Sequence, residues 1–383
     1  MNSILTLLIG PSIRRPDGIS VAFKIVNDGF VERGLRFKII DIGTSDNTRA
    51  VGTFSFKRVI EIIYALAHYA WFILYSQNIY LLVGQSKVSF FRDLIFIWSA
   101  YMLNCRIVLH VHSGGYGEFY ESQPSWLRRL IAKTLNCADA IIVLGNALRN
   151  QFSFMHNDEK LYVVPNCSPA DPIIRNFQGK VLSRNKPISL LYLSNLIETK
   201  GYLDCIEACN ILYHERSIPF HFDICGGFVL HSHGSKWKSE EEAIAYLENK
   251  IDALGLSDVI SYNGIVSGRS KHRYLLDADI LILPTYYAWE GQPISIIEAL
   301  TYGIPVISTN YRAIPEQIIN SINGLFVEPR TPIGIADCVE YLWKNPNVFS
   351  TMSINARKYY LEHFTRHKHL DLLIPIILGE NVH

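Results

Sequence analysis

The sequence alternates between short apolar runs and longer segments in which apolar residues recur every three or four positions. Short apolar runs bounded by glycine, proline or polar residues predict strands that are buried on both faces, as in a parallel sheet. The longer segments predict helices that cover such sheets. We expect strands at residues 4–9, 37–42, 79–83, 106–110, 140–144, 161–164, 188–193, 220–225, 259–262 and 280–283. The pattern therefore predicts an α/β protein built from strand–helix units.

The stretch from residue 280 to residue 300 carries the clearest candidate chemistry. The apolar run is stopped by Pro284, a loop follows, and Pro293 stands where a helix can begin. The first turn of a helix presents free N–H groups and the positive end of its dipole, which together bind phosphate. Glu290 lies in the loop and Glu298 about one turn inside the helix. Strand–loop–helix units are common, however, so the spacing alone also fits two structural glutamates.

The residues around this stretch form a longer pattern. Residues 290–329 contain E-G-Q-P-I-S-I-I-E-A-L-T-Y-G-I-P-V-I, then I-P-E, then N-G-L-F-V-E-P. The pattern resembles the retaining glycosyltransferase family 4, in which E-G-x-P-x-x-x-x-E-A-x-x-x-G-x-P-V-I is followed by I-P-E and N-G-x-x-V-x-P. The resemblance covers residues 284–329, with glycines, prolines and glutamates in register. It implies the GT-B fold, in which two Rossmann-like α/β domains face each other across a cleft.

We place the domain boundary in the polar, proline-bearing segment 168–187. Residues 1–178 then form an acceptor-side domain and residues 179–348 a nucleotide-sugar-binding domain. By the resemblance, residues 349–383 hold a helix, at about 349–364, that crosses back to the first domain.

The resemblance also assigns donor-binding roles in the second domain. S-N-L-I-E-T-K-G resembles the family's G-R-L-x-x-x-K-G, whose arginine and lysine neutralise the diphosphate of the donor. Lys200 is kept, whereas Asn195 replaces the arginine and brings no charge. Glu298 is expected to accept hydrogen bonds from ribose hydroxyls and Glu290 to face the transferred sugar. The remaining expected donor contacts are Gly18, Gly226, Gly264, the amides of Gly291, Gln292 and Ile294, and Pro293 through its carbonyl group only.

The first domain has its own candidates. His110 and His112 end the strand at residues 106–110, where ligands of open α/β sheets collect, and we expect their side chains to point to opposite faces. In the related family a histidine at this strand end faces the transferred sugar, and we carry that role to His112 alone. Three further residues are candidate contacts with the acceptor or its phosphates: Arg14 and Arg15, which also fit two solvated arginines, and Tyr116, which could stack on a sugar. Ser20 could cap the helix that follows Gly18.

Metal and other cofactors are not expected. D-x-D is the metal motif of a different glycosyltransferase fold, but residues 277–279 precede a strand here, where the related family has aspartate for structural reasons. The seven cysteines form no C-x-x-C pair and no zinc-type cluster, which favours a reducing cytosol. The N-terminus reads as a first strand rather than a signal peptide.

Charge and aromatic content point to a second kind of partner. The net charge of +1 gives no indication of nucleic acid binding. Residues 1–180 hold 19 Lys and Arg against 13 Asp and Glu, whereas residues 181–383 hold 17 against 22. The helices expected at 59–75 and 88–103 are strongly apolar and aromatic, and we expect the first to be buried or membrane-facing rather than spanning. The basic first half therefore fits an anionic membrane surface or an ordinary surface bias.

Together these observations predict a retaining, metal-independent hexosyltransferase. It would move a sugar from a nucleotide-diphosphate sugar, with UDP or GDP as carrier, to a saccharide acceptor. We expect a polyprenyl-diphosphate-linked acceptor of bacterial surface polysaccharide synthesis, such as O-antigen, capsule or exopolysaccharide, at the cytoplasmic face of the membrane. Two alternatives remain open: a nucleotide-sugar epimerase or hydrolase on the same fold, and a non-catalytic partner that binds nucleotide sugars.

Overall fold

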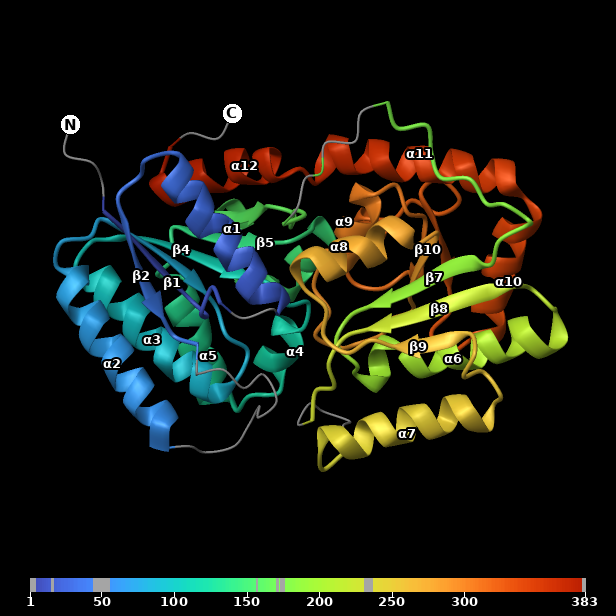
Figure 1. Cartoon of the computed structure of the whole chain (residues 1–383). Helices are drawn as coiled ribbons and strands as arrows, with labels where there is room; N and C mark the ends of the chain where they lie inside the picture. Colours follow the sequence, from blue (N-terminus) through green and yellow to red (C-terminus); the bar gives the residue numbers. More distant parts are fainter. Residues whose placement is uncertain are drawn as a thin grey trace.

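The computed structural model describes residues 5–14, 17–43, 56–155, 158–169, 172, 176–230 and 237–380. Two α/β domains lie side by side, each built on a six-stranded parallel sheet, and one C-terminal helix lies along each domain (Figure 1). The predicted fold class, two Rossmann-like domains of the GT-B type, is confirmed.

The first sheet has the strand order β2-β1-β3-β4-β5-β6. Its strands are short and almost entirely apolar, because helices cover both faces. Its elements are β1 (Thr6–Gly10), α1 (Gly18–Glu32), β2 (Phe37–Asp41), α2 (Phe56–Ile73), β3 (Asn78–Leu82), α3 (Lys87–Met102), β4 (Arg106–Val111), α4 (Tyr116–Glu121), α5 (Ser125–Leu135), β5 (Ala140–Val143) and β6 (Leu161–Val163).

Alternate residues of these strands enter two separate cores. On one face Leu8, Tyr80 and Val108 pack with α1 and with α12 (Arg366–Leu378). On the other face Leu7 and Ile79 pack with α2, α3 and α5. None of the helices that the structure describes is both long enough and apolar enough to cross a membrane.

The second sheet has the strand order β12-β11-β10-β7-β8-β9. All strands are parallel, but the order in which they follow one another along the chain reverses between β7 and β10. A single large core holds its helices on both faces. Its elements are β7 (Ile188–Leu193), α6 (Tyr202–Asn210), β8 (Phe220–Cys225), α7 (Glu240–Ala253), β9 (Ile260–Tyr262), α8 (Gly268–Asp277), β10 (Ile280–Leu283), α9 (Ile294–Thr301), β11 (Val306–Thr309), β12 (Gly324–Val327) and α10 (Pro332–Lys344).

The C-terminal segment differs from the sequence prediction. The helix expected at about 349–364 is α11 (Pro346–His363), and it packs on the second domain through Phe349, Met352 and Tyr360. The element that lies on the first domain is the separate helix α12, which the sequence analysis did not predict. Its apolar residues extend around most of the helix and include Pro375, so no clear amphipathic period marks it.

The packing of α12 gives a direct test with neighbouring residues. Leu373 is fully buried, whereas Leu372 is 40% exposed. We expect Leu373→Ala to lower the free energy of unfolding by about 2–5 kcal/mol, because it leaves a cavity between α12 and α1. Leu372→Ala should cost about 1 kcal/mol or less. Urea unfolding followed by circular dichroism measures both, and equal losses would contradict this account of α12.

Candidate functional site

The candidate site lies where the second sheet reverses its strand order. Ligands of open α/β sheets bind beyond the carboxyl ends of the strands at such a switch point. Here the loop after β7 carries Lys200 and the loop after β10 carries Glu290. The order of the strands therefore brings together two residues that are 90 positions apart in the chain.

Lys200 and Glu290 form a largely buried ion pair. The Lys200 Nζ lies 3.2 Å from Glu290 Oε2, and the two side chains are only 14% and 7% exposed. Thr285 donates its hydroxyl hydrogen to the same carboxylate oxygen at 2.9 Å, and Ser194 Oγ lies 3.2 Å from the lysine nitrogen. Tyr287 places its ring 5.5 Å from that nitrogen. Lys200 is thus held at the mouth of the loop by polar groups and one aromatic face.

The start of α9 has the properties expected of an anion-binding helix terminus. Pro293 occupies the N-cap position, and no side chain caps the helix among the residues that the structure describes. The Pro293 carbonyl group already accepts a hydrogen bond from Gln317 Nε2 at 2.9 Å. The carbonyl group of Pro293, an expected donor contact, thus already has one partner within the protein.

Glu298 lies in α9 and is 4% exposed. Burial raises the pKa of its carboxyl group, and the ammonium group of Lys271, 2.6 Å away, opposes that rise. Lys271 belongs to α8, and its side chain is 26% exposed. Both glutamates of the motif therefore sit in ion pairs whose lysines reach the solvent.

The two domains touch at this loop through their backbones. A methyl group at Gly291 would lie 2.0 Å from the carbonyl oxygen of His112, and one at Gly114 would lie 2.1 Å from the carbonyl oxygen of Glu290. Ser113 donates a hydrogen bond to the carbonyl group of Trp289 at 3.0 Å. Side chains larger than hydrogen at positions 114 and 291 would force this contact apart.

His112 brings an unused polar atom to the contact. Its Nε2 atom is buried and has no hydrogen-bond partner among the described residues. Burial, and then the neighbouring His369, lower the pKa of His112 to about 3, so the ring is neutral near pH 7. A buried, unpaired ring nitrogen is unfavourable unless a ligand or water completes it.

The structure places the other donor candidates at the same edge. The Gly226 amide donates to the Gly264 carbonyl group at 2.7 Å, and Gly226 lies so close to Ser194 that any side chain there would collide with it. Asn195 is exposed beside this turn. Gly18 is the first residue of α1 in the other domain, and a methyl group on it would lie 3.8 Å from Ile294 Cδ1. Gly18 therefore lies close to the start of α9, and Gly226 lies beside Ser194, whose hydroxyl group contacts Lys200.

Several expectations for the first domain need correction. Tyr116 is fully buried and stacks on Phe152 with ring centroids 5.3 Å apart, so it cannot stack on a sugar. His110 and His112 point to the same side, with ring centroids 4.1 Å apart, because side chains two positions apart on a strand share a face. Asp17 caps α1, and Ser20 is buried behind it.

The two arginines of the first loop are placed unequally. Arg14 is exposed at the end of the loop that follows β1. Arg15 lies outside the described residues.

Further contacts between the domains were not predicted. Asn166 donates its side-chain amide to the carbonyl group of Gln292 at 3.0 Å, so the V-V-P-N segment meets the E-G-Q-P segment directly. The carboxylate of Glu316, from I-P-E, accepts hydrogen bonds from the amides of Asn146 and Ala147 at 2.9 and 2.7 Å. Gln292 and Glu316 stand inside the recognised motifs, but no sequence pattern pairs them with residues of the first domain.

Two positively charged residues near the site were not predicted from the sequence. Arg312 reaches Glu118 of the first domain at 2.6 Å, and Lys271 neutralises Glu298. Lys271 alternates with Arg269 and Arg273 at the start of α8, which is the one sequence signal that a positive group lies near the acids.

A groove of about 660 Å³ also lies between the domains, on the side of Gln292 that faces Phe364 and Lys368. Lys200, Glu290 and Glu298 do not line this groove. It is therefore separate from the two ion pairs beside α9.

The D-x-D triplet lies at the opposite edge of the sheet. Asp279 precedes β10, and its carboxylate accepts a 2.9 Å hydrogen bond from the amide of Ser189, at the start of β7. Asp277 is exposed beside Arg273. Their position and contacts are structural.

The backbone contact between the domains gives one prediction. We expect Gly291→Ala to separate the loop from His112 and to move the two domains apart, because the added methyl group would lie 2.0 Å from a backbone oxygen. Gly334→Ala is the matched control, since its nearest neighbour would lie at 3.4 Å. Small-angle X-ray scattering should give a larger radius of gyration for Gly291→Ala only. Identical radii for the two variants would contradict the closed contact.

The pairing of Glu298 gives a second prediction. Lys271→Met leaves a buried carboxylate without its partner, which costs about 3–5 kcal/mol. Because burial raises the pKa of Glu298 above its ordinary 4.5, the folded state holds the proton to higher pH, and stability falls as pH rises through the folded pKa. The penalty should be small near pH 5 and large at pH 8.

Urea unfolding of the wild type and Lys271→Met at both pH values measures this penalty. Adding Glu298→Gln to Lys271→Met removes the titrating group and should remove the pH dependence. A penalty that is the same at pH 5 and pH 8 would exclude the ion pair as its cause.

Comparisons with known proteins agree with this geometry. Residues 174–359, which contain the second domain, match the family model "Glycosyl transferases group 1". The amylovoran biosynthesis glycosyltransferase AmsK of Erwinia amylovora is 30% identical over 144 residues, which is 37% of this chain. That match spans only 32% of the relative's own length.

Solved structures with the same fold match nearly the whole chain. Alr3699/HepE of Anabaena, in complex with UDP and glucose, has a TM-score of 0.71 at 14% identity and covers 98% of this chain and 100% of its own. The lipopolysaccharide outer core galactosyltransferase WaaB, in its apo form, has a TM-score of 0.64 at 14% identity and covers 98% and 99%. The second domain is thus similar to the group 1 glycosyl transferases, and the whole chain shares the two-domain fold of these solved structures.

Proposed function

We propose that the protein transfers a sugar from a nucleotide-diphosphate sugar to a saccharide acceptor with retention of anomeric configuration. The observation that carries the proposal is the uncapped start of α9, flanked by the Lys200–Glu290 and Lys271–Glu298 pairs and closed from the first domain by His112. Such a site offers amides and a cation for a diphosphate and carboxylates for sugar hydroxyls.

Donor binding would exchange protein contacts for ligand contacts. The diphosphate takes the amides of Gly291, Gln292 and Ile294 and the ammonium group of Lys200, which is already held 3.2 Å from Glu290. Glu298 accepts the ribose hydroxyls while Lys271 keeps its negative charge neutralised. The base lies beside Gly226 and Gly264. Asn195 supplies a hydrogen bond where the family has an arginine, so Lys200 carries most of the charge.

Transfer would proceed on one face of the sugar without a covalent enzyme intermediate. The bond from the anomeric carbon to the leaving phosphate oxygen breaks as the acceptor oxygen attacks, and that phosphate oxygen takes the acceptor's proton. Glu290 and the neutral ring of His112 would position the sugar through hydrogen bonds. In this mechanism the protein contributes orientation and charge stabilisation, with no metal ion.

The acceptor we propose is a lipid-linked saccharide used for bacterial surface polysaccharide, reached at the inner face of the membrane. AmsK is described as acting in amylovoran biosynthesis, and WaaB as a lipopolysaccharide outer core galactosyltransferase. Arg14, exposed at the loop after β1, is a candidate contact for the acceptor's phosphates.

Product analysis tests the function. The protein is incubated with a panel of UDP- and GDP-sugars, with and without a bacterial lipid extract, and the products are separated. We expect sugar to appear on lipid only when the extract is present. Free sugar or an isomerised donor in the absence of extract would instead indicate a hydrolase or an epimerase. Donor binding without turnover would indicate the non-catalytic partner that the loss of arginine at Asn195 makes conceivable.

The site assignments predict different kinetic defects. Glu298→Ala should mainly raise the KM for the donor, because it removes a contact present in both ground and transition states. Glu290→Ala and His112→Ala should mainly lower kcat, by about 10²–10³-fold, because they act at the reacting sugar. Glu248→Ala, on the exposed side of α7, is the matched control. Steady-state kinetics at subsaturating donor measure each effect. If any of the three site variants turned over at the wild-type rate, the role assigned to that residue would be wrong.

A further inference from the structure

The first domain exposes an apolar face on two neighbouring helices. The outward side of α2 and its C-terminal end carries large apolar side chains that are each more than half exposed, at the spacing of one helical stripe. These are Ile60, Ile63, Tyr64, Trp71, Leu74 and Tyr75. From residue 59 to residue 77 the only charged residue is Glu61, apart from His68. An amphipathic surface helix would have polar residues on this side.

Helix α3 continues the same face. Val88, Phe91, Ile95 and Met102 are exposed along it, at 73%, 43%, 47% and 75%. The two helices lie next to each other (Figure 1), and Tyr69 of α2 donates its hydroxyl hydrogen to the Phe96 carbonyl group of α3 at 2.8 Å. We call these exposed residues of α2 and α3 the apolar face. Contiguous apolar surface of this kind marks a docking site.

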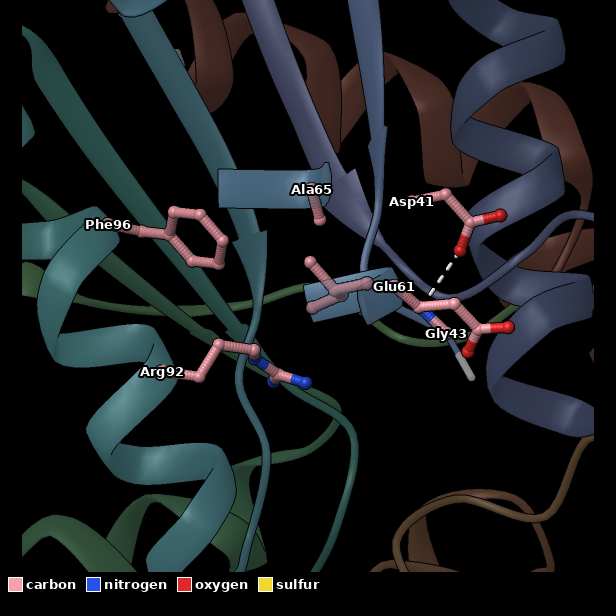
Figure 2. Close-up of a pocket in the computed structure, with 7 residues that line it drawn as sticks. Asp41, Gly43, Glu61, Ala65, Arg92 and Phe96 are labelled. Carbon is pink, nitrogen blue, oxygen red and sulfur yellow. Dashed lines mark hydrogen bonds between the residues drawn. The ribbon is translucent and has the colours of Figure 1, made fainter. Parts of the chain in front are cut away.

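The acids of these helices point away from the apolar face. Glu61 lines a pocket of only about 10 Å³ between the end of β2 and helix α3, together with Asp41 and Arg92 (Figure 2). Asp93 is 1% exposed and accepts the Gly84 amide. No carboxylate of α2 or α3 therefore lies on the exposed stripe among the described residues.

Positive charge adjoins the apolar face instead. Helix α5 holds Arg128, Arg129 and Lys133 and no acidic residue. The Lys133 Nζ lies 5.1 Å from the ring centroid of Trp98 in α3, which places this basic helix beside the face. Trp126 of α5 is 60% exposed. Apolar and aromatic side chains bordered by lysine and arginine are the composition that enters an anionic lipid surface.

The direction of the helices connects the face to the site. In a strand–helix–strand unit each helix begins at the carboxyl edge of the sheet, the edge at which β4 ends beside His112. The apolar face therefore starts, at Ile60 and Val88, on the crevice side of the domain and extends away from it.

We propose that the apolar face of α2 and α3 rests in the interfacial region of an anionic lipid bilayer, with α5 contacting the head groups. This inference rests on the proposed function, because it supplies the surface from which a lipid-linked acceptor enters the crevice. The helices lie in the interface and do not cross it. A second copy of the chain fits the face less well, because the described residues of the face include no carboxylate to pair with the basic side chains of α5.

Vesicle sedimentation tests the surface. The protein is mixed with vesicles of phosphatidylcholine alone or of an equal mixture of phosphatidylcholine and phosphatidylglycerol. We expect the wild type to sediment with the anionic vesicles. The double variant Trp71→Ser with Leu74→Ser should bind at least about tenfold more weakly, because two interfacial anchors are lost. Arg129→Gln with Lys133→Gln should lose the preference for anionic vesicles.

Ile333→Ser with Tyr341→Ser is the matched control, because both residues are 47% exposed on α10 of the second domain. This variant should bind like the wild type. Equal losses in both apolar double variants, or no sedimentation of the wild type, would overturn the proposal. So would a dimer in size-exclusion chromatography that the Trp71, Leu74 variant abolishes without any vesicle binding.

The outcome is separable from the proposed function. Donor turnover in vesicle-free buffer with a detergent-solubilised acceptor should be unchanged by the Trp71, Leu74 substitutions. Vesicle binding without any donor turnover would support the membrane-binding surface and contradict the proposed glycosyltransferase function. Donor turnover without vesicle binding would support the proposed function and contradict the membrane-binding surface.

Discussion

The arrangement of the site depends on the close approach of two backbones. Residues 112–115 of the first domain and 288–292 of the second come so near that Gly114 and Gly291 have no room for a side chain. This approach brings His112 to the loop that holds Glu290, and it aligns Asn166 with Gln292 and Glu316 with the amides at 146 and 147. A nucleotide sugar held at α9 would be enclosed by the same contact, which excludes water from the bond that is transferred.

Charge balance is the second requirement of the closed crevice. Each of two buried glutamates has its own lysine, and each lysine comes from a loop or helix that precedes the strand β10. Lys200 is shared between a carboxylate of the protein and the diphosphate that we propose it binds. Without donor the Lys200–Glu290 pair is neutral. A bound diphosphate would add negative charge beside it, which Lys200 and the amides at the start of α9 would have to offset together.

The sequence predicted the fold because its strands are short, mostly apolar runs bounded by turn residues, and a parallel sheet suits such runs. It located Lys200, Glu290 and Glu298 because the motif fixes their register. It did not locate Lys271 or Arg312, because the partner of a buried carboxylate is chosen by packing between elements that are distant in the chain. Tyr116 was wrongly predicted to contact the acceptor. An aromatic residue beside glycines can either stack on a ligand or pack in a core, and Tyr116 is fully buried in the core.

The first domain shows why helix α2 could not be interpreted from its sequence alone. A helix that is apolar around its whole circumference fits a buried element as well as one that faces lipid. In the structure Ala65, Tyr69 and Ile73 face the sheet while the opposite side remains exposed. Only the position of the neighbouring elements decides which side of α2 is buried and which side is exposed, and therefore whether the exposed side can contact lipid.

The most direct test of the account is a crystal structure of the protein with a bound nucleoside diphosphate. We expect the terminal phosphate within hydrogen-bond distance of the amides at the start of α9 and of the Lys200 ammonium group, with the ribose on Glu298. A nucleotide bound in the groove beside Phe364 and Lys368, or elsewhere away from α9, would contradict the central claim.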